Sequence, residues 1–444
     1  MGFQIRSWSQ DRLLRGILKN SSYLFGSNAV SIILSMLQGI LAARLLGAAG
    51  FGTVAAVVIP FVSNVNRLLS FRMSELVVKY LGQYLVENNT RQAGAVVKGA
   101  ALVELITSGA AYLVLLLLAP WAAITLVHDP QAGNLIIIYG LVLLATGAYE
   151  TSSGVMQVTR QFRCIAQVNL LQNIVTVALI LLAYLARGNM LHILLAYLAG
   201  KGLAGLTLNF MAFRQLNIEL GRGWYRGPMK LPWREVSSFA ISTNLHATIN
   251  LVVRDSETLL IGALRSTTEA GYFKIALGVI NLVMMPIEPF IATTYAEIAR
   301  SISQRDWSIT RRLLKRVSAI SGVWTAVAGG GLMLAGYWLI PFVYGIEYRP
   351  AYPALVVLLL GYGFANIFNW NRSLLLALEM PAYPLKASGL SGLVKTILTV
   401  LLVPTWGYVM EAVILSGYFI SSIAFMVRRG LIEIKIRERA TVSA

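Results

Sequence analysis

The chain has 444 residues, of which 57% are hydrophobic and 13% are charged, whereas a soluble protein averages about 25% charged residues. Hydropathy this high along the whole chain excludes a soluble core and indicates a membrane protein with several spanning segments. The net charge of +18 does not point to a nucleic-acid partner, because the basic residues gather in short loops, as the positive-inside rule requires. One cysteine, Cys164, and three histidines exclude an internal disulfide and a Cys/His metal cluster, and we expect no cofactor.

Apolar segments of roughly 20 residues are long enough to span a bilayer, and the sequence predicts twelve of them. The first six lie at about 20–43, 51–72, 93–119, 134–156, 164–186 and 189–213. The second six lie at about 236–263, 271–296, 315–341, 351–377, 384–403 and 407–427. The polar start of the chain lacks an apolar region followed by a cleavage site, so we expect no removable signal peptide. The fold class predicted is therefore an all-α polytopic membrane protein.

Lysine and arginine gather on one side of these predicted helices. They occupy the N-terminal arm, the loops after the second, fourth and eighth helices, the central stretch and the C-terminal tail. The opposite side carries only Arg44, Arg187, Arg265 and Arg349. Both termini are therefore expected in the cytoplasm, which requires an even number of helices and agrees with twelve.

The central stretch 214–235 is the most polar internal segment and is rich in glycine and proline. It predicts a cytoplasmic linker between an N-terminal six-helix bundle at 1–213 and a C-terminal six-helix bundle at 236–444, which ends in a basic cytoplasmic tail. In each bundle the loop after the second helix, 75–90 or 296–311, is amphipathic. These loops are either surface helices at the headgroup level or ordinary connectors.

The two predicted bundles align without a gap when the chain is shifted by 221 residues. The shift superimposes glycine, proline and charged positions: Ala49-Gly50-Phe51 on Ala270-Gly271-Tyr272, Arg44 on Arg265, and Pro120 on Pro341. Six helices per repeat is an even number, so both repeats enter from the same side and are parallel. A central cavity between two such bundles is where a substrate site is expected.

The predicted seventh helix carries one polar stripe. Its members recur at spacings of three and four residues and therefore share one helix face; they are Thr243, His246, Asn250, Arg254 and Glu257. A membrane helix with such a stripe turns it toward a water-filled cavity or a protein interior. The first helix has an uncharged stripe at Asn28, Ser31, Ser35 and Gln38, which either lines the cavity or joins helices to each other.

Two stretches carry a family resemblance: ARLLGAAGFGTVAAVV after the first helix and RDSETLLIGALRSTTEAGYFKIALGVI across the seventh and eighth. They resemble the polysaccharide transporter family, the Wzx-type flippases of the multidrug/oligosaccharidyl-lipid/polysaccharide exporter superfamily. Asp255 stands where that family often has an aspartate before Leu-Leu-Ile-Gly. The resemblance covers nearly the whole chain. Related peptidoglycan lipid flippases usually have fourteen helices, which argues against that assignment.

The resemblance implies a function as well as a fold. It implies translocation of a polyprenyl-diphosphate-linked oligosaccharide across the cytoplasmic membrane, by alternating access of two bundles, for cell-surface polysaccharide synthesis. The location implied is the inner membrane of a bacterial cell or the cell membrane of an archaeon. The partners implied are the lipid-linked substrate, the bilayer and polysaccharide assembly proteins.

Six basic residues are predicted at membrane depth, where a charge costs at least ~2.5–3.5 kcal/mol even on insertion scales. These candidate substrate-binding residues are Arg67, Lys201, Arg254, Lys274, Arg372 and Lys395. An excess of cations in a cavity suits an anionic headgroup such as a diphosphate, which arginine can grip through two hydrogen bonds. No acidic residue lies within one turn of Arg67, which favours a role in binding.

Structural roles remain open for several of these residues. Arg254 lies beside two acidic residues and can form an ion pair with them. Lys201 and Lys395 can snorkel or pair between helices. Arg372 lies close enough to a helix end to act as an interfacial anchor. Glu288 stands between two prolines, where it can simply hydrogen-bond a neighbouring helix.

The energy source is not encoded by a nucleotide-binding motif, since no P-loop is present. An ion gradient, the membrane potential or substrate flux would have to drive transport. The candidate coupling carboxylates are Asp255, Glu257 and Glu288.

Two other functional classes compete with the flippase. A cation-coupled multidrug or small-molecule exporter of the same superfamily would need a cavity dominated by acids or aromatics, whereas the membrane region here has more bases. A membrane-integral polysaccharide polymerase or ligase would need a sizeable outer loop with catalytic residues. The longest outer connection, about 119–134, offers only His128 and Asp129, so we predict a transporter without catalytic residues.

Overall fold

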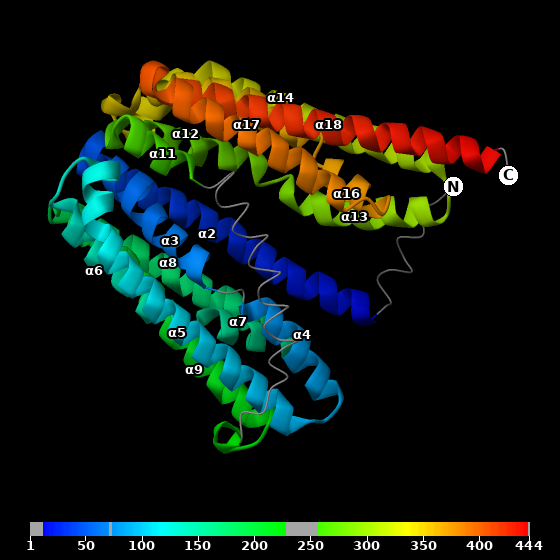
Figure 1. The fold of residues 1–444 in the computed structure, drawn as a ribbon, viewed down its shortest axis with the longest axis horizontal. Helices are drawn as coiled ribbons and strands as arrows, with labels where there is room; N and C mark the ends of the chain where they lie inside the picture. Colours follow the sequence, from blue (N-terminus) through cyan, green and yellow to red (C-terminus); the bar gives the residue numbers. More distant parts are fainter. Residues whose placement is uncertain (1–11, 71–72, 228–255, 443–444) are drawn as a thin grey trace. The chain divides into compact units, whose positions relative to one another are not determined.

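The computed structural model describes residues 12–70, 73–227 and 256–442, and its regular structure over these ranges is entirely helical (Figure 1). Within them, nine helical stretches are long and apolar enough to cross a membrane. One of the nine, Val30–Leu69, overlaps two of the predicted segments, 20–43 and 51–72. The predicted seventh segment, 236–263, lies mostly outside the described residues. The prediction of an all-α polytopic membrane protein is confirmed.

The described residues form two compact units. Unit 1 draws on Met1–Leu46, Val58–Thr125 and Asp129–Thr248, and unit 2 on Gly47–Val57, Leu126–His128 and Ile249–Ala444. Two short pieces of the N-terminal half of the sequence thus pack with the C-terminal half. The division at 1–213, 214–235 and 236–444 stays a prediction about the sequence.

Within the described residues unit 1 has eight α-helices, the first of which continues into unit 2. Their bounds are α2 Arg12–Phe51, α3 Ile59–Leu69, α4 Met73–Val86, α5 Thr90–Ala122, α6 Ala132–Ala145, α7 Tyr149–Val158, α8 Phe162–Leu185 and α9 Met190–Glu219. The predicted fourth segment, 134–156, is divided into α6 and α7 by a break after Ala145.

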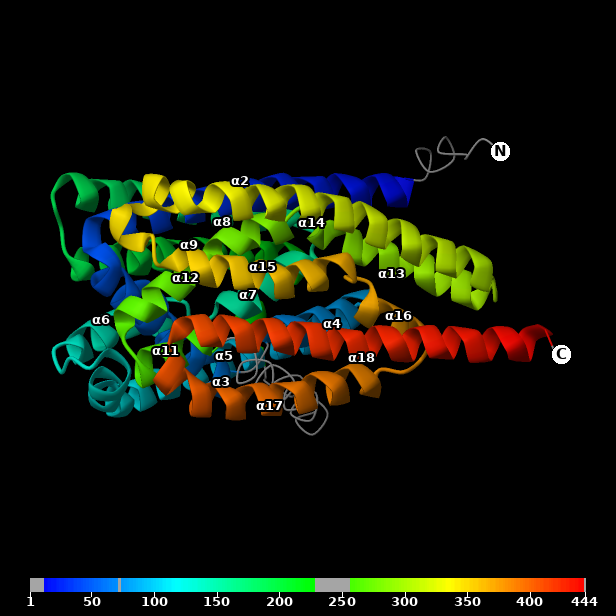
Figure 2. The ribbon, with the colours of Figure 1, turned by 90° about the horizontal axis from the view of Figure 1, so that it is seen from above.

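Unit 2 has a corresponding set of helices. Their bounds are α11 Glu257–Leu264, α12 Thr267–Met284, α13 Glu288–Ser303, α14 Trp307–Tyr344, α15 Ala351–Ile367, α16 Asn371–Ala377, α17 Ala382–Trp406 and α18 Tyr408–Val442. α17 and α18 run side by side (Figure 2). The predicted tenth segment is also divided, into α15 and α16.

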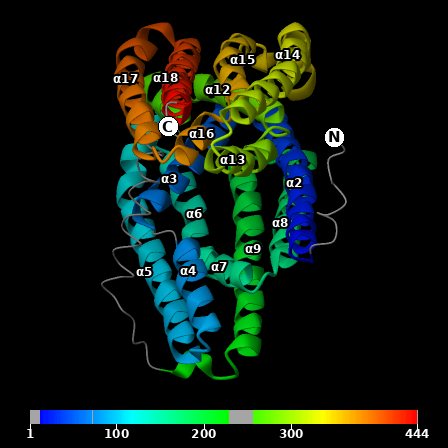
Figure 3. The same cartoon turned by 90° about the vertical axis from the view of Figure 1, so that its right-hand side faces the viewer.

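The helix boundaries follow the shift of 221 residues. Shifted by that amount, α8 at Phe162–Leu185 falls on 383–406, and α17 spans Ala382–Trp406. The break between α6 and α7 falls on the break between α15 and α16. The packing repeats as well, because α4 contacts α7 (Figure 3) as α13 contacts α16. The two sequence halves therefore encode one helical pattern twice.

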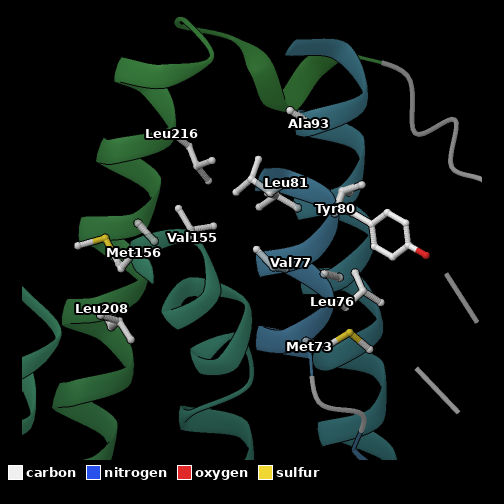
Figure 4. Close-up of a cluster of buried hydrophobic side chains, with 14 of the residues drawn as sticks. Met73, Leu76, Val77, Tyr80, Leu81, Ala93, Val155, Met156, Leu208 and Leu216 are labelled. Carbon is white, nitrogen blue, oxygen red and sulfur yellow. The ribbon is translucent and has the colours of Figure 1, made fainter. Parts of the chain in front are cut away.

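The amphipathic segment after the second predicted helix forms α4, and its apolar face packs onto protein. Leu76, Val77 and Leu81 lie in a buried cluster with Val155 of α7 and Leu208 of α9 (Figure 4). A corresponding cluster in unit 2 joins α13, α14, α16 and α18. These clusters fix the short helices α7 and α16, which are too short to be stable by themselves.

Glycines in the motif after the first predicted helix allow backbones to approach closely within unit 2. Gly47 has a φ of +68°, a conformation that glycine adopts without the strain a side chain would add. A Cβ on Gly52 would lie 1.7 Å from the carbonyl oxygen of Thr267, and one on Gly271 would lie 2.8 Å from that of Ala48. Gly52 and Gly271 therefore meet where only backbone fits.

Candidate functional site

Unit 1 encloses a cavity of about 340 Å³. Its wall is formed by α3, α5, α6, α7, α8 and α9. The charged side chains on the wall are Arg67, Glu104, Glu150 and Lys201, and the neutral polar ones are Ser63, Asn66, Ser70, Ser108, Thr146, Tyr149 and Gln172. A cavity with a few convergent polar groups is the usual form of a small-ligand site.

Two of the predicted basic residues meet at this cavity. Arg67 lies in the last turn of α3 and is exposed. Lys201 lies on α9, half-buried, with its Nζ 6.0 Å from the centre of the Tyr139 ring, near the outer limit for a cation–π contact. The two positive charges repel each other, so an anion placed between them would be stabilised by both.

Glu104 supplies a negative charge to the wall, but its carboxylate is hydrogen-bonded to the start of α7. Its carboxylate accepts hydrogen bonds from the backbone N–H groups of Glu150 and Thr151, both at 2.9 Å, and from the Thr151 hydroxyl at 2.7 Å. The first N–H groups of a helix have no partner within the helix and carry partial positive charge. Glu104 therefore holds the break before α7 in place and is partly neutralised there.

The uncharged stripe of the first predicted helix joins helices of unit 1. The Gln38 side-chain amide donates to the backbone oxygen of Asn173 at 3.3 Å and to its side-chain oxygen at 3.2 Å. Ser35 donates to the same side-chain oxygen at 3.3 Å. Of the two roles open for this stripe, helix-to-helix bonding therefore accounts for Ser35 and Gln38.

Unit 2 contains a buried ion cluster made of Glu257, Lys395, Thr399 and Glu411. The ammonium group of Lys395 lies 2.6 Å from Glu257 Oε1 and 3.7 Å from Glu411 Oε1. Thr399, one turn along α17, donates to Glu411 Oε2 at 2.7 Å. The three charged residues are exposed by 4% or less, so the charges interact with little screening by water.

The ion cluster brings two carboxylates to one ammonium group. Glu257 Oε1 and Glu411 Oε1 both contact Lys395 Nζ, at 2.6 Å and 3.7 Å. A proton that binds either carboxylate would weaken its attraction for the lysine. Protonation within the membrane can therefore alter the contacts that this cluster makes between α11, α17 and α18.

The remaining predicted residues lie elsewhere. Lys274 is half-buried on α12, and Arg372 is exposed on α16. Glu288 begins α13, but its side chain is outside the described part of the structure. Arg254 and Asp255 lie outside the described residues.

The sequence analysis missed Glu411. It lies at the fourth residue of α18 and is fully buried. The available signal was a lone carboxylate inside an apolar segment. Among the described residues no group of three or more His, Cys, Asp or Glu side chains could hold a metal ion.

Most of the chain matches a known family. Residues 40–353 match the family described as polysaccharide biosynthesis protein. The inner membrane protein YghQ of Escherichia coli (strain K12) is 26% identical over 356 residues, which cover 79% of this chain and 99% of that protein.

Two solved structures share the fold. The inward-facing conformation of a multidrug resistance MATE family transporter of the MOP superfamily has a TM-score of 0.74 at 13% identity, and the match covers 92% of this chain and 96% of that one. The inward closed conformation of the lipid II flippase MurJ has a TM-score of 0.69 at 15% identity, and the match covers 94% of this chain and 90% of that one. These matches establish a MATE-like fold.

Proposed function

Because the chain belongs to the polysaccharide biosynthesis protein family, we propose that it is a flippase for a lipid-diphosphate-linked oligosaccharide. It would move this lipid across the cytoplasmic membrane by alternating access, with both termini in the cytoplasm. The inner-membrane location of the relative supports that membrane for this chain. The observation that carries the proposal is the meeting of Arg67 and Lys201 at one cavity of unit 1.

The cavity suits the diphosphate of such a lipid. Its volume of about 340 Å³ lies at the small end of the range for ligand pockets, which is roomy for a diphosphate and small for an oligosaccharide. Arg67 offers a guanidinium that can hold two phosphate oxygens, and Lys201 adds a point charge. Asn66 and Gln172 on the same wall can donate neutral hydrogen bonds.

The same wall argues against a cationic drug as the substrate. Such a drug would meet Arg67 and Lys201, and the buried Glu104 is already bonded to the start of α7. The remaining acidic residue on the cavity wall, Glu150, is half-buried. The multidrug exporter is therefore the weaker candidate for this chain.

The buried ion cluster of unit 2 is our candidate for coupling. Glu257 and Glu411 share the charge of Lys395, so a proton or a cation that enters the cluster changes which carboxylate the lysine binds. Asp255 and Glu288 remain candidate coupling carboxylates from the sequence. In this proposal Lys395 acts through coupling, and Lys274, Arg254 and Arg372 remain candidate substrate contacts.

The proposal is tested by removing the two cavity charges. Arg67→Gln and Lys201→Met should each reduce translocation of a lipid-linked oligosaccharide in reconstituted vesicles at least tenfold, because each removes a charge-assisted contact worth about 1.5–3 kcal/mol. Arg91→Gln, at an exposed site at the start of α5, is the matched control. Full translocation by the double variant Arg67→Gln/Lys201→Met, present in the membrane at the parent level, would refute the role of this cavity. Transport of cationic drugs that survives in that variant would identify the exporter instead.

A further inference from the structure

The two longest helices of unit 2 extend beyond the thickness of a bilayer. α14 has 38 residues and α18 has 35, which at 1.5 Å per residue gives about 57 Å and about 52 Å. The hydrocarbon core of a membrane is only about 30 Å thick. The start of α14 and the end of α18 lie together, joined by an ion pair between Arg311 and Glu438 and by a shared buried cluster.

The exposed face of α14 changes from basic to apolar within two turns. Arg312, Lys315 and Arg316 are exposed at its start. Ile320 and Val323 follow on the same side, exposed by 55% and 66%. Apolar side chains that are exposed on a spanning helix face lipid tails, so these basic residues stand at the level of the lipid headgroups.

α18 shows the same change in the opposite chain direction. Phe425 is exposed by 50%, and the exposed Arg428 and Lys435 follow it at helical spacing. Ile432 and Ile436, exposed by 39% and 52%, alternate with these bases. A face that mixes bases with exposed apolar side chains is typical of a helix segment lying among headgroups.

Internal ion pairs hold this end of α18 rigid. Glu433 accepts hydrogen bonds from Arg429 at 2.9 Å and from Arg437 at 3.0 Å. Arg437 also donates to the backbone oxygen of Leu378 at 2.8 Å, which ties α18 to the end of α16. The acidic residues are thus used inside the unit, and the exposed face keeps its positive charge.

The repeat-related stretches of unit 1 carry fewer bases. Residues 428–442 contain five basic residues, whereas the matching stretch 207–221 contains one, Arg214. The six residues 311–316 contain four, whereas 90–95 contain one. Orientation in the membrane explains which side is basic, but it does not explain why bases are denser in these two stretches than at the matching positions of unit 1.

We propose that the two basic faces of unit 2, defined by Arg312, Lys315 and Arg316 of α14 and by Arg428 and Lys435 of α18, bind the headgroups of anionic phospholipids. The phosphates accept hydrogen bonds from the bases, and the acyl chains lie against the apolar residues that follow on each helix. This inference is independent of the transported substrate. It concerns a surface outside the unit 1 cavity and the buried ion cluster.

The test measures lipid binding to the full chain in detergent by native mass spectrometry. Phosphatidylglycerol should bind at least tenfold more tightly than phosphatidylcholine with the same acyl chains, because each base near a headgroup contributes about 1 kcal/mol. This preference should weaken in high salt. Equal affinity for the two lipids would overturn the proposal.

Two variants test whether the preference for phosphatidylglycerol depends on the basic face of α14. The variant Arg312→Gln/Lys315→Gln/Arg316→Gln should lose at least tenfold in affinity for phosphatidylglycerol. A matched variant of unit 1, Arg91→Gln/Arg160→Gln/Arg222→Gln, removes three exposed charges and should change it less than twofold. Equal losses in both would show that net charge alone attracts the lipid, against a site.

A conservative variant separates charge from folding. Arg312→Lys/Arg316→Lys keeps the charge and should retain the lipid preference. Loss of preference in this variant with an unchanged melting temperature would overturn the headgroup assignment, as would unchanged lipid binding in the glutamine variant.

Discussion

The two units share one helical pattern but place their charged side chains differently. In unit 1 the bases Arg67 and Lys201 line a cavity, and the carboxylate of Glu104 binds backbone N–H groups. In unit 2 the base Lys395 is 3% exposed and lies against Glu257 and Glu411. A duplicated scaffold thus carries one cavity with bases and acids on its wall and one buried cluster in which a lysine contacts two carboxylates.

The 221-residue shift shows how few positions create this difference. Glu104 falls on Thr325, whose hydroxyl accepts a hydrogen bond at 2.8 Å from Asn366, next to the break before α16. Lys201 falls on Ser422, and Lys395 falls on Ile174. Both halves thus place polar side chains beside the matching break, because backbone groups freed inside a membrane need partners. In unit 1 a carboxylate accepts from the freed backbone N–H groups, and in unit 2 the Asn369 side chain donates to the backbone oxygen of Asn366.

The largest expected effect on stability comes from a comparison of Lys→Met substitutions, one in each unit. Lys395→Met should lower the free energy of unfolding by about 3–5 kcal/mol, because it removes the ammonium group that two buried carboxylates contact. Lys201→Met should change it by less than about 1 kcal/mol, since Lys201 borders a cavity, while it removes transport. Thermal unfolding in detergent and flipping in vesicles measure the two effects.

A second variant separates charge from packing in the ion cluster. Glu257→Gln/Lys395→Met/Glu411→Gln removes all three charges together and should recover most of the lost stability, because a neutral replacement of a buried ion pair is often tolerated. Transport by this variant should no longer be coupled to the ion gradient. If this variant is as unstable as Lys395→Met alone, packing around the lysine rather than its charge stabilises unit 2.

The glycine contacts give the next largest effect. Gly52→Ala should destabilise the chain by about 1–3 kcal/mol as an overpacked site, because its Cβ would lie 1.7 Å from a backbone oxygen that cannot rotate away. Gly39→Ala, on α2 with nothing within 4 Å of its Cβ, should be neutral or stabilising by up to about 1 kcal/mol. Melting temperatures of the two variants measured side by side give the comparison, and equal values would contradict it.

Much of this fold could be predicted from the sequence because the bilayer demands long apolar helices and short loops. The shift of 221 residues located the repeat, and the element boundaries follow it. The breaks before α7 and α16 were not predicted. The side chains that bind beside these breaks come from other helices: Glu104 accepts from backbone N–H groups at the first, and Thr325 accepts from the Asn366 side chain at the second.

The site could be predicted only in part for a similar reason. Depth along a helix identified Arg67, Lys201 and Lys395 as charges in the membrane, but depth does not say which helix face meets which neighbour. The cavity joins Arg67 to Lys201, which are 134 residues apart, and the ion cluster joins Glu257 to Lys395, which are 138 apart. Such distant pairings depend on tertiary packing, which a single sequence does not display.

Substitutions at Glu104 and Thr325, which the 221-residue shift superimposes, should have smaller effects on stability. Glu104→Gln should cost about 1.5–3 kcal/mol, the range for hydrogen bonds to a charged group, and Thr325→Val about 0.5–1.5 kcal/mol, the range for a neutral one. Glu104→Gln should also raise hydrogen exchange at the start of α7, where Glu104 binds Glu150 and Thr151. Equal costs for the two variants would show that the carboxylate charge adds nothing at this break.

The smallest effect concerns the caps outside the membrane. α5 begins at a neutral cap, Asn89, which accepts from Gln92 N–H at 3.2 Å, and α14 begins at an ionised one, Asp306. Hydrogen bonds from Ile309 N–H and from the Ser308 hydroxyl, both at 2.9 Å, lower the pKa of Asp306 below its ordinary value.

The sign of the resulting pH dependence follows from that lowered pKa. A carboxylate with a lower pKa in the folded chain stabilises it fully above the unfolded pKa, and this contribution is lost as the pH falls through the folded pKa. Melting curves between about pH 6 and about pH 3 should therefore show a steeper loss for the parent chain than for Asp306→Asn. Asn89→Asp should add the same acid sensitivity to unit 1, so identical slopes in all three chains would contradict a role for cap charge.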